Sequence, residues 1–175
     1  IDAEGIVKLA DGSFWVGEEY GPSILHIAPD GKVLERWVPK GVKPSLDGAG
    51  YEIKETLPAI LRKRPLNRGI ESMAVSPDEK YLYFAMQSPL SNPDKATYKK
   101  GRNLRIFKID RPAGTIIGEY VYVIDTADTF GMDNAKKKRK QNDVKISELT
   151  AVETDKLVVL ERISKTTKFY LVDLS

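Results

Sequence analysis

The chain has 175 residues, 41% of them hydrophobic and 9% aromatic, which is enough for one globular core. Its 28 basic and 25 acidic side chains leave a formal charge of +3, too small an excess to indicate nucleic-acid binding. The absence of cysteine excludes disulfides and thiolate metal sites. No apolar stretch reaches the roughly 18 residues that a membrane-spanning helix needs, and no signal peptide is visible.

The first 38 residues are predicted to form one antiparallel blade of a β-propeller. Tight turns are marked by Asp11-Gly12, Gly21-Pro22 and Asp30-Gly31. The β-prone segments between these turns are residues 6–9, 14–18, 24–28 and 33–38. An open meander or a sandwich is the alternative.

Residues 39–69 read as an insertion with one short helix. Thr56 can cap this helix, Pro58 lies near its first turn, and Pro65 ends it. Leu57, Ile60 and Leu61 would share its buried side.

A second blade is predicted over residues 70–125, and a partial third blade over residues 144–175. The expected strands are residues 70–76, 81–87, 104–110 and 116–125, followed by residues 145–152, 157–162 and 168–174. Residues 88–102 read as a long surface loop, and residues 126–143 as a second insertion. The basic run Lys136–Lys140 in that insertion reads as solvated, with an anion or membrane patch as the alternative.

Three blades do not close a propeller, which typically has about 4–8 of them. The third blade also lacks a fourth strand, which would leave unpaired edges. We therefore expect these residues to be roughly half of a larger domain, whose remainder is needed to close the fold.

The three predicted blades repeat one another in sequence. Each first strand begins with a glutamate, and these glutamates are Glu4, Glu71 and Glu148. Such repetition is the sequence signature of blades around one axis. The three glutamates are therefore predicted to gather near the axis.

Further polar side chains lie at the equivalent strand ends: Asp2, Glu18, Glu19, Gln87 and Glu161. Carboxylates that converge in a partly dry space must be protonated, paired with cations or bound to metal. Oxygen ligands of this kind suit Ca²⁺ or Mg²⁺. Pairing with Arg68, Arg102 and Arg162, which would tie the blades together, is the alternative, and direct acid–base catalysis is a third.

The sequence offers no assembled nucleophile. His26 is the single histidine and lies in an apolar strand, which favours a packing position. Gly-x-Ser-x-Gly, a phosphate-binding glycine-rich loop and histidine-rich metal spacing are all absent. Tyr20 faces either the funnel of the propeller or the packed interior.

An ordered set of motifs resembles the phytase-like domain family, also described as esterase-like activity of phytase. The resemblance covers essentially the whole chain. It is carried by residues 2–5, 15–22, 27–31, 67–72, 76–78, 86–90, 102–105, 147–151 and 160–162. One departure is Ile163, at a position where the family pattern leads us to expect an Asp.

The resemblance implies a propeller-like phosphoric-ester hydrolase, often exported to an extracellular, periplasmic or organelle-lumen location. The first hypothesis is therefore metal-assisted hydrolysis of a small phosphate ester, with Ca²⁺ at the central carboxylates. It assigns catalysis to Glu19, Glu71 and Glu148. It assigns substrate binding to Arg68, Arg102, Arg162, Tyr20 and Gln87, and metal binding to Asp2, Glu4, Glu18 and Glu161. The second hypothesis is a non-catalytic binding propeller in which the same acids and arginines are structural.

Overall fold

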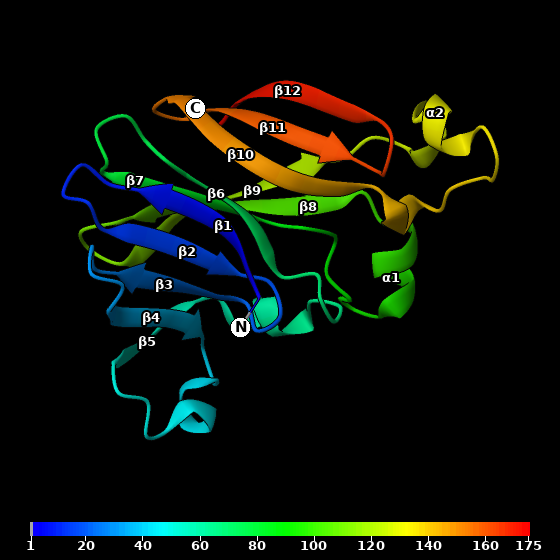
Figure 1. Ribbon diagram of the computed structural model, residues 1–175. Helices are drawn as coiled ribbons and strands as arrows, with labels where there is room; N and C mark the ends of the chain where they lie inside the picture. The colour runs from blue at the N-terminus through cyan, green and yellow to red at the C-terminus, as the bar shows by residue number, and fades with distance from the viewer. Residues whose placement is uncertain (1) are drawn as a thin grey trace.

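The computed structural model describes residues 2–175, and three β-sheets form their framework (Figure 1). The first sheet contains β1 (Ala3–Lys8), β2 (Phe14–Glu18), β3 (Ser23–Ile27), β4 (Val33–Pro39) and β5 (Glu52–Leu57). The second contains β6 (Ile70–Val75), β7 (Tyr81–Met86), β8 (Asn103–Asp110) and β9 (Thr115–Val123). The third contains β10 (Lys145–Glu153), β11 (Lys156–Arg162) and β12 (Thr167–Asp173).

In each sheet consecutive strands pair, and every pair except β4 with β5 is antiparallel, as expected of propeller blades. Hairpin turns set this order, and two of them require glycine because Gly12 and Gly31 adopt φ of +85° and +87°. Over residues 2–175 the three blades form part of a propeller and do not close a ring. The predicted all-β, propeller-like architecture is confirmed.

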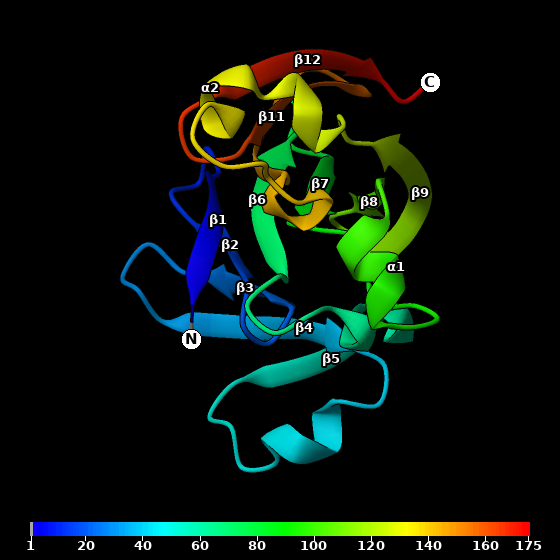
Figure 2. The same cartoon turned by 90° about the vertical axis from the view of Figure 1, so that its right-hand side faces the viewer.

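The first strands of the three blades, β1, β6 and β10, lie side by side, with β6 in the middle (Figures 1 and 2). Small residues permit this approach: a Cβ at Gly17 would lie 2.6 Å from Ile70 Cγ2 of the next blade. The buried core runs through all three sheets and includes Trp37, Phe84, Phe107 and Val159. These contacts fix the inner strands around one axis.

Hydrogen bonds among Tyr83, Lys108 and Asp155 connect the second and third blades, and we call this group the polar lock. Tyr83 donates from its hydroxyl to Asp155 Oδ1 at 3.1 Å and accepts from the Asp155 backbone N–H at 3.0 Å. Lys108, which is 8% exposed, donates to Asp155 Oδ2 at 2.7 Å. The ammonium and the hydroxyl thus satisfy one carboxylate together.

The segment 39–69 differs from its predicted structure. Thr56 does not cap a helix, because it lies in β5, which extends the first sheet by pairing in parallel with β4. The helical turn begins after Pro58 and is a 3₁₀ helix, η2 (Ala59–Lys63). Ile53 and Leu57 are the buried residues of β5, and the strand is fixed by its pairing with β4 and not by its burial pattern.

The remaining connections carry short helical pieces. They are η1 (Lys43–Leu46), α1 (Lys95–Lys100), η3 (Ala127–Thr129), α2 (Gly131–Asn134) and η4 (Gln141–Asp143). The sequence reading missed α1, although Asp94 accepts from the Thr97 backbone N–H at 2.9 Å as an N-cap. Among residues 2–175 no helix is both long and apolar enough to cross a membrane.

Candidate functional site

Three equivalent strand ends converge near the axis. In the register of the blades, Ala3 pairs with Glu18, Ile70 with Met86, and Ile146 with Glu161. The residue after each second-strand partner is therefore equivalent, and these residues are Glu19, Gln87 and Arg162. A register shift follows each of these pairs in the first strand, where Glu4, Glu71 and Ser147 lie.

The Gln87 side chain connects two of the carboxylates. Its amide N–H₂ donates to Glu19 and to Glu71, which are 2% and 6% exposed. Its carbonyl oxygen accepts from Arg68, and Ser147 Oγ donates to Glu71 Oε1 at 3.1 Å. One amide thereby holds acids from the first and second blades together.

A glycine allows the blades to meet at this point. Gly69 precedes β6, and a Cβ there would lie 2.0 Å from the Glu19 carbonyl oxygen. Gly69 O also accepts from the Gln87 backbone N–H at 2.9 Å. Only a residue without a side chain fits between these strand ends.

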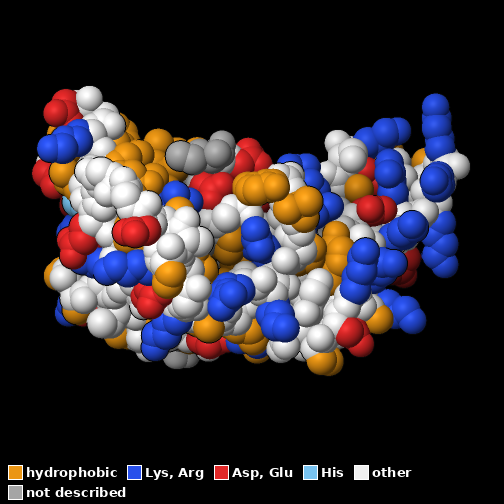
Figure 3. Space-filling view, turned by 90° about the horizontal axis from the view of Figure 1, so that it is seen from below, with side chains coloured by type: hydrophobic (Ala, Val, Ile, Leu, Met, Phe, Trp, Pro, Cys, Tyr) orange, Lys and Arg blue, Asp and Glu red, His pale blue; other side chains and the backbone are white. Residues whose placement is uncertain are grey.

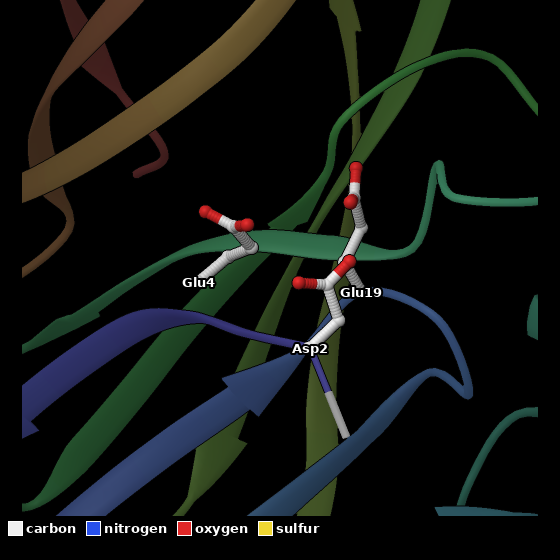
Figure 4. Close-up of side chains that lie close together, drawn as sticks. All are labelled: Asp2, Glu4 and Glu19. Carbon is white, nitrogen blue, oxygen red and sulfur yellow. The ribbon is translucent and has the colours of Figure 1, made fainter.

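The acidic half of the site comprises Asp2, Glu4 and Glu19, whose carboxylates lie close together (Figure 4). One oxygen from each lies within 4.8 Å of the others. Burial, followed by the charge of Glu71, raises the pKa of Glu19 to about 8. Burial and the charges of Glu71 and Asp2 also raise the pKa of Glu4.

The donor chemistry of the acidic half fits a hard divalent cation. Its ligand atoms are all carboxylate oxygens: Asp2 precedes β1, Glu4 lies in β1, and Glu19 follows β2. Ca²⁺ and Mg²⁺ prefer oxygen ligands of this kind. Burial and neighbouring carboxylates both disfavour the anionic forms of Glu4 and Glu19, and a bound cation would offset both effects. Asp2, Glu4 and Glu19 are thus the residues able to hold such an ion.

The basic half of the site comprises Arg68, Lys145 and Arg162. Arg162 Nη2 lies 3.6 Å from Glu71 Oε1, and Lys145 is the register partner of Arg162. Burial, followed by the charges of Arg68 and Arg162, lowers the pKa of Lys145. Figure 3 shows acidic side chains near the middle of the upper edge of this face, with basic side chains directly beside them.

Two predicted metal ligands, Glu18 and Glu161, make hydrogen bonds outside the acidic half. Glu18 accepts from the N–H of Asp2 at 3.1 Å and of Gly21 at 2.8 Å, and it pairs with Arg36 at 3.3 Å. Glu161 accepts from the Tyr122 hydroxyl at 2.6 Å and the Asp125 N–H at 3.0 Å. Because neighbours in a strand point to opposite faces, each glutamate faces away from the strand-end residue that follows it.

Glu148 is one position out of register with Glu71. Ile70-Glu71-Ser72 corresponds to Ile146-Ser147-Glu148, since both isoleucines are fully buried and occupy the same register position. Ser147 therefore reaches Glu71, whereas Glu148 is exposed and lines a channel between β1, β6 and β10. Although the residue as a whole is exposed, partial desolvation of its carboxyl raises the pKa of Glu148.

Arg102 and Tyr20 also lie apart from the hydrogen-bonded group. Arg102 donates from Nε to Ile124 O at 2.7 Å and lines a pocket of the second blade. Tyr20 is 54% exposed, and its carbonyl oxygen accepts from Arg64 Nε at 2.9 Å. The structure thus brings together seven of the twelve predicted site residues: Asp2, Glu4, Glu19, Arg68, Glu71, Gln87 and Arg162.

Lys145 and Ser147 were missed by the sequence reading. Alignment of the buried isoleucines, instead of the leading glutamates, would have identified Ser147 as the partner of Glu71. Lys145 directly precedes Ile146, but nothing in its local sequence distinguishes it from a surface lysine.

Two further sequence positions have structural roles. His26 stacks on Trp15 with ring centroids 4.4 Å apart and lies 3.2 Å from Ser13 Oγ, as expected for a packing position. Ile163, at the position where an Asp was expected, is 3% exposed and belongs to the core.

A family model described as "Phytase-like: Esterase-like activity of phytase" matches residues 1–175. The chain belongs to this family. A relative from Arthroderma benhamiae, named "Uncharacterized secreted protein", is 31% identical over 140 residues. That stretch is 72% of this phytase-like chain and 27% of the relative, so the chain spans about a quarter of the relative's length.

Solved propellers are similar at low identity. The β-propeller domain of Myceliophteria thermophila Cps50 (Swd1) gives a TM-score of 0.46 at 8% identity, covering 97% of the phytase-like chain and 38% of the other. The WD40 repeats of RRP9 give a TM-score of 0.37 at 12% identity, covering 97% and 51%.

Proposed function

We propose that this protein hydrolyses phosphoric esters at the site formed by Glu19, Glu71 and Gln87, with the help of a divalent cation bound beside it. The observation that carries the proposal is the Gln87 amide, which joins Glu19 to Glu71 while its carbonyl accepts from Arg68. Carboxylates and arginines are thereby held at one point. Membership of the phytase-like family supports the same reaction class.

The basic and acidic residues of the site have different proposed roles. Arg68 and Arg162 bind phosphate oxygens, because a planar guanidinium donates several N–H groups to an oxyanion. Glu71, oriented by Gln87 and Ser147, accepts the proton of the water whose oxygen attacks phosphorus while the ester P–O bond breaks. The alcohol leaves with a proton from solvent.

Asp2, Glu4 and Glu19 are proposed to hold the cation, and Ca²⁺ is the ion their oxygen donors fit. When bound, it would supply charge neutralisation of the phosphate and polarisation of water. Glu19 thus moves from the predicted catalytic set to the metal-binding set. Secretion is proposed because the Arthroderma benhamiae relative is named as a secreted protein.

The test is phosphate release from p-nitrophenyl phosphate and from phytate by the full-length natural polypeptide that contains residues 1–175. Glu71→Gln should lower kcat/KM by about 10²-fold or more, as expected for loss of a general base. Chelation should abolish turnover, and added Ca²⁺ should restore it. The matched control is Glu119→Gln, an exposed glutamate that pairs with Arg105 on the outer strands.

The second candidate function is a non-catalytic binding propeller. The observation that favours it is the use of Glu18 and Glu161 in hydrogen bonds that connect strands and blades. It predicts that Glu71→Gln lowers stability and that no phosphate ester is turned over above the level of an inactive control. Undiminished turnover by Glu71→Gln in chelator would instead contradict the roles proposed for Glu71 and for the cation.

A further inference from the structure

Several hydrogen-bond donors in the basic half of the site have no acceptor within residues 2–175. Within residues 2–175, Lys145 Nζ makes no hydrogen bond or ion pair, although the side chain is half-buried. Arg68 uses only Nη1, toward Gln87 and toward Ser88 Oγ at 3.5 Å. A guanidinium has five N–H donors and an ammonium three, so most of these donors are open to a ligand.

The strand geometry brings Lys145 to the same place as the two arginines. Ile146 is fully buried, so Lys145 and Ser147 project from the other side of β10. Ser147 Oγ contacts Glu71 Oε1 at 3.1 Å, and Arg162, the register partner of Lys145, lies 3.6 Å from the same oxygen. Lys145 therefore flanks the carboxylate at the centre of the site.

Three cations held together without full pairing are unfavourable in the unliganded protein. Burial and the charges of Arg68 and Arg162 lower the pKa of Lys145, even though Glu71 and Glu19 act in the opposite direction. Within residues 2–175 no acid forms a hydrogen bond or ion pair with Lys145 Nζ, so its charge has no direct partner. An added anion with two negative charges would provide one.

We propose that Arg68, Lys145 and Arg162 form a subsite for the dianionic phosphate group, and that Lys145 determines its preference for phosphate over singly charged anions. The two arginines present planar donor groups, whereas Lys145 contributes a compact point charge. This inference deepens the proposed function, since it assigns the group of the substrate that this side of the site recognises. It concerns binding alone and needs no turnover.

Calorimetry with phenylphosphonate tests the subsite, because this phosphate analogue has no ester bond to cleave. The protein is the full-length natural polypeptide, saturated with Ca²⁺. Lys145→Met should weaken phenylphosphonate binding about tenfold or more, the size expected for loss of a charged hydrogen bond. Lys145→Arg should retain most of the affinity. Lys32→Met, in the exposed turn after β3, removes the same charge and should bind as the wild type does.

Benzenesulfonate, a singly charged anion of similar shape, supplies the specificity readout. Wild-type protein should prefer phenylphosphonate, and Lys145→Met should lose that preference. Thermal unfolding without ligand separates a binding role from a structural one: removal of a poorly compensated cation should leave Tm unchanged or raise it. A lower Tm with unchanged phenylphosphonate affinity would instead make Lys145 a structural partner of Glu71 and Glu19.

The outcomes distinguish this inference from the hydrolase proposal. Lys145-dependent phenylphosphonate binding without any ester turnover would support the subsite and contradict the hydrolase. Ester turnover together with equal phenylphosphonate affinity in wild type and Lys145→Met would support the hydrolase and contradict the subsite. Failure of the wild-type protein to bind phenylphosphonate would overturn the subsite.

Discussion

Gln87 determines the character of the site at the scale of single residues. An amide is the one uncharged side chain that can donate to two carboxylates and accept from an arginine at once. In the blade register, Glu19 and Arg162 occupy the equivalent strand ends of the first and third blades. The three equivalent strand ends around the axis therefore carry an acid, an amide and a base. This order gives the site an acidic half and a basic half.

Gly69 allows that arrangement, and its substitution tests how tightly the blades are held. Gly69→Ala would place a methyl group 2.0 Å from the Glu19 carbonyl oxygen, so one strand end must shift. We expect a loss of about 1–3 kcal/mol in the free energy of unfolding, the usual cost of overpacking. Urea denaturation measures it. The control is Gly50→Ala, where an added Cβ meets nothing within 4 Å; an equal effect at both positions would contradict the close contact.

The limits of the sequence reading are also visible at single residues. Glu19, Glu71 and Gln87 could be identified because strand-end positions follow the period of the blade. Glu148 was misplaced because the order of Glu and Ser differs between the second and third blades, and a bulge decides which of them faces Glu71. Lys145 could not be identified, since its role depends on strand pairing with Arg162.

The strands that were predicted well are those with a clear run of apolar residues and a turn sequence at their ends. All four strands of the second blade lie within two residues of their expected bounds, because Pro77-Asp78 and the apolar run 81–86 are unambiguous. β5 was mistaken for part of an insertion because only Ile53 and Leu57 mark its buried side. Its parallel pairing with β4 is a long-range choice that local propensity does not encode.

Asp133 shows how an insertion is fastened to a blade. This carboxylate, 3% exposed, accepts from the backbone N–H of Ser164, Lys165 and Thr166, each at 2.9 Å, in the loop between β11 and β12. Burial alone would raise the pKa of Asp133, but these hydrogen bonds outweigh it and the pKa lies below its usual value. The insertion 126–143 is thereby connected to the third blade.

The depressed pKa of Asp133 gives a pH prediction with a definite sign. A carboxyl whose pKa is lower in the folded state stabilises the protein above its unfolded pKa, about 4, and loses that contribution as pH falls through the folded value. The difference in urea midpoint between wild type and Asp133→Asn should therefore be large at pH 7 and shrink below about pH 4. Hydrogen exchange at residues 164–166 should quicken in the variant. A midpoint difference that is constant from pH 7 to pH 3 would contradict this account.

The three blades act as one body at the scale of the whole molecule because each interface combines apolar packing with polar contacts. Glycines in the first blade admit Ile70 and Met73, and the Tyr83–Asp155–Lys108 contacts join the second blade to the third. The site needs both interfaces, since its residues come from all three blades. Its geometry is therefore a property of the assembly of blades and not of any one sheet.

Tyr83→Phe tests the second of these interfaces. It removes both hydrogen bonds between the Tyr83 hydroxyl and Asp155 while leaving the buried ring in place. We expect a loss of about 1–2 kcal/mol in the free energy of unfolding. Tyr51→Phe, whose hydroxyl makes no hydrogen bond within residues 2–175, is the control. If both variants unfold at the same urea concentration as wild type, the polar lock does not stabilise the interface.

A calcium titration by calorimetry tests the central claim most directly. The full-length natural polypeptide should bind Ca²⁺, and Asp2→Asn combined with Glu19→Gln should abolish that binding while leaving the protein folded by circular dichroism. Glu119→Gln, remote on the outer strands, should bind as wild type does. The absence of Ca²⁺ binding by the folded wild-type protein, or unchanged binding by the double variant, would contradict a cation site at Asp2, Glu4 and Glu19.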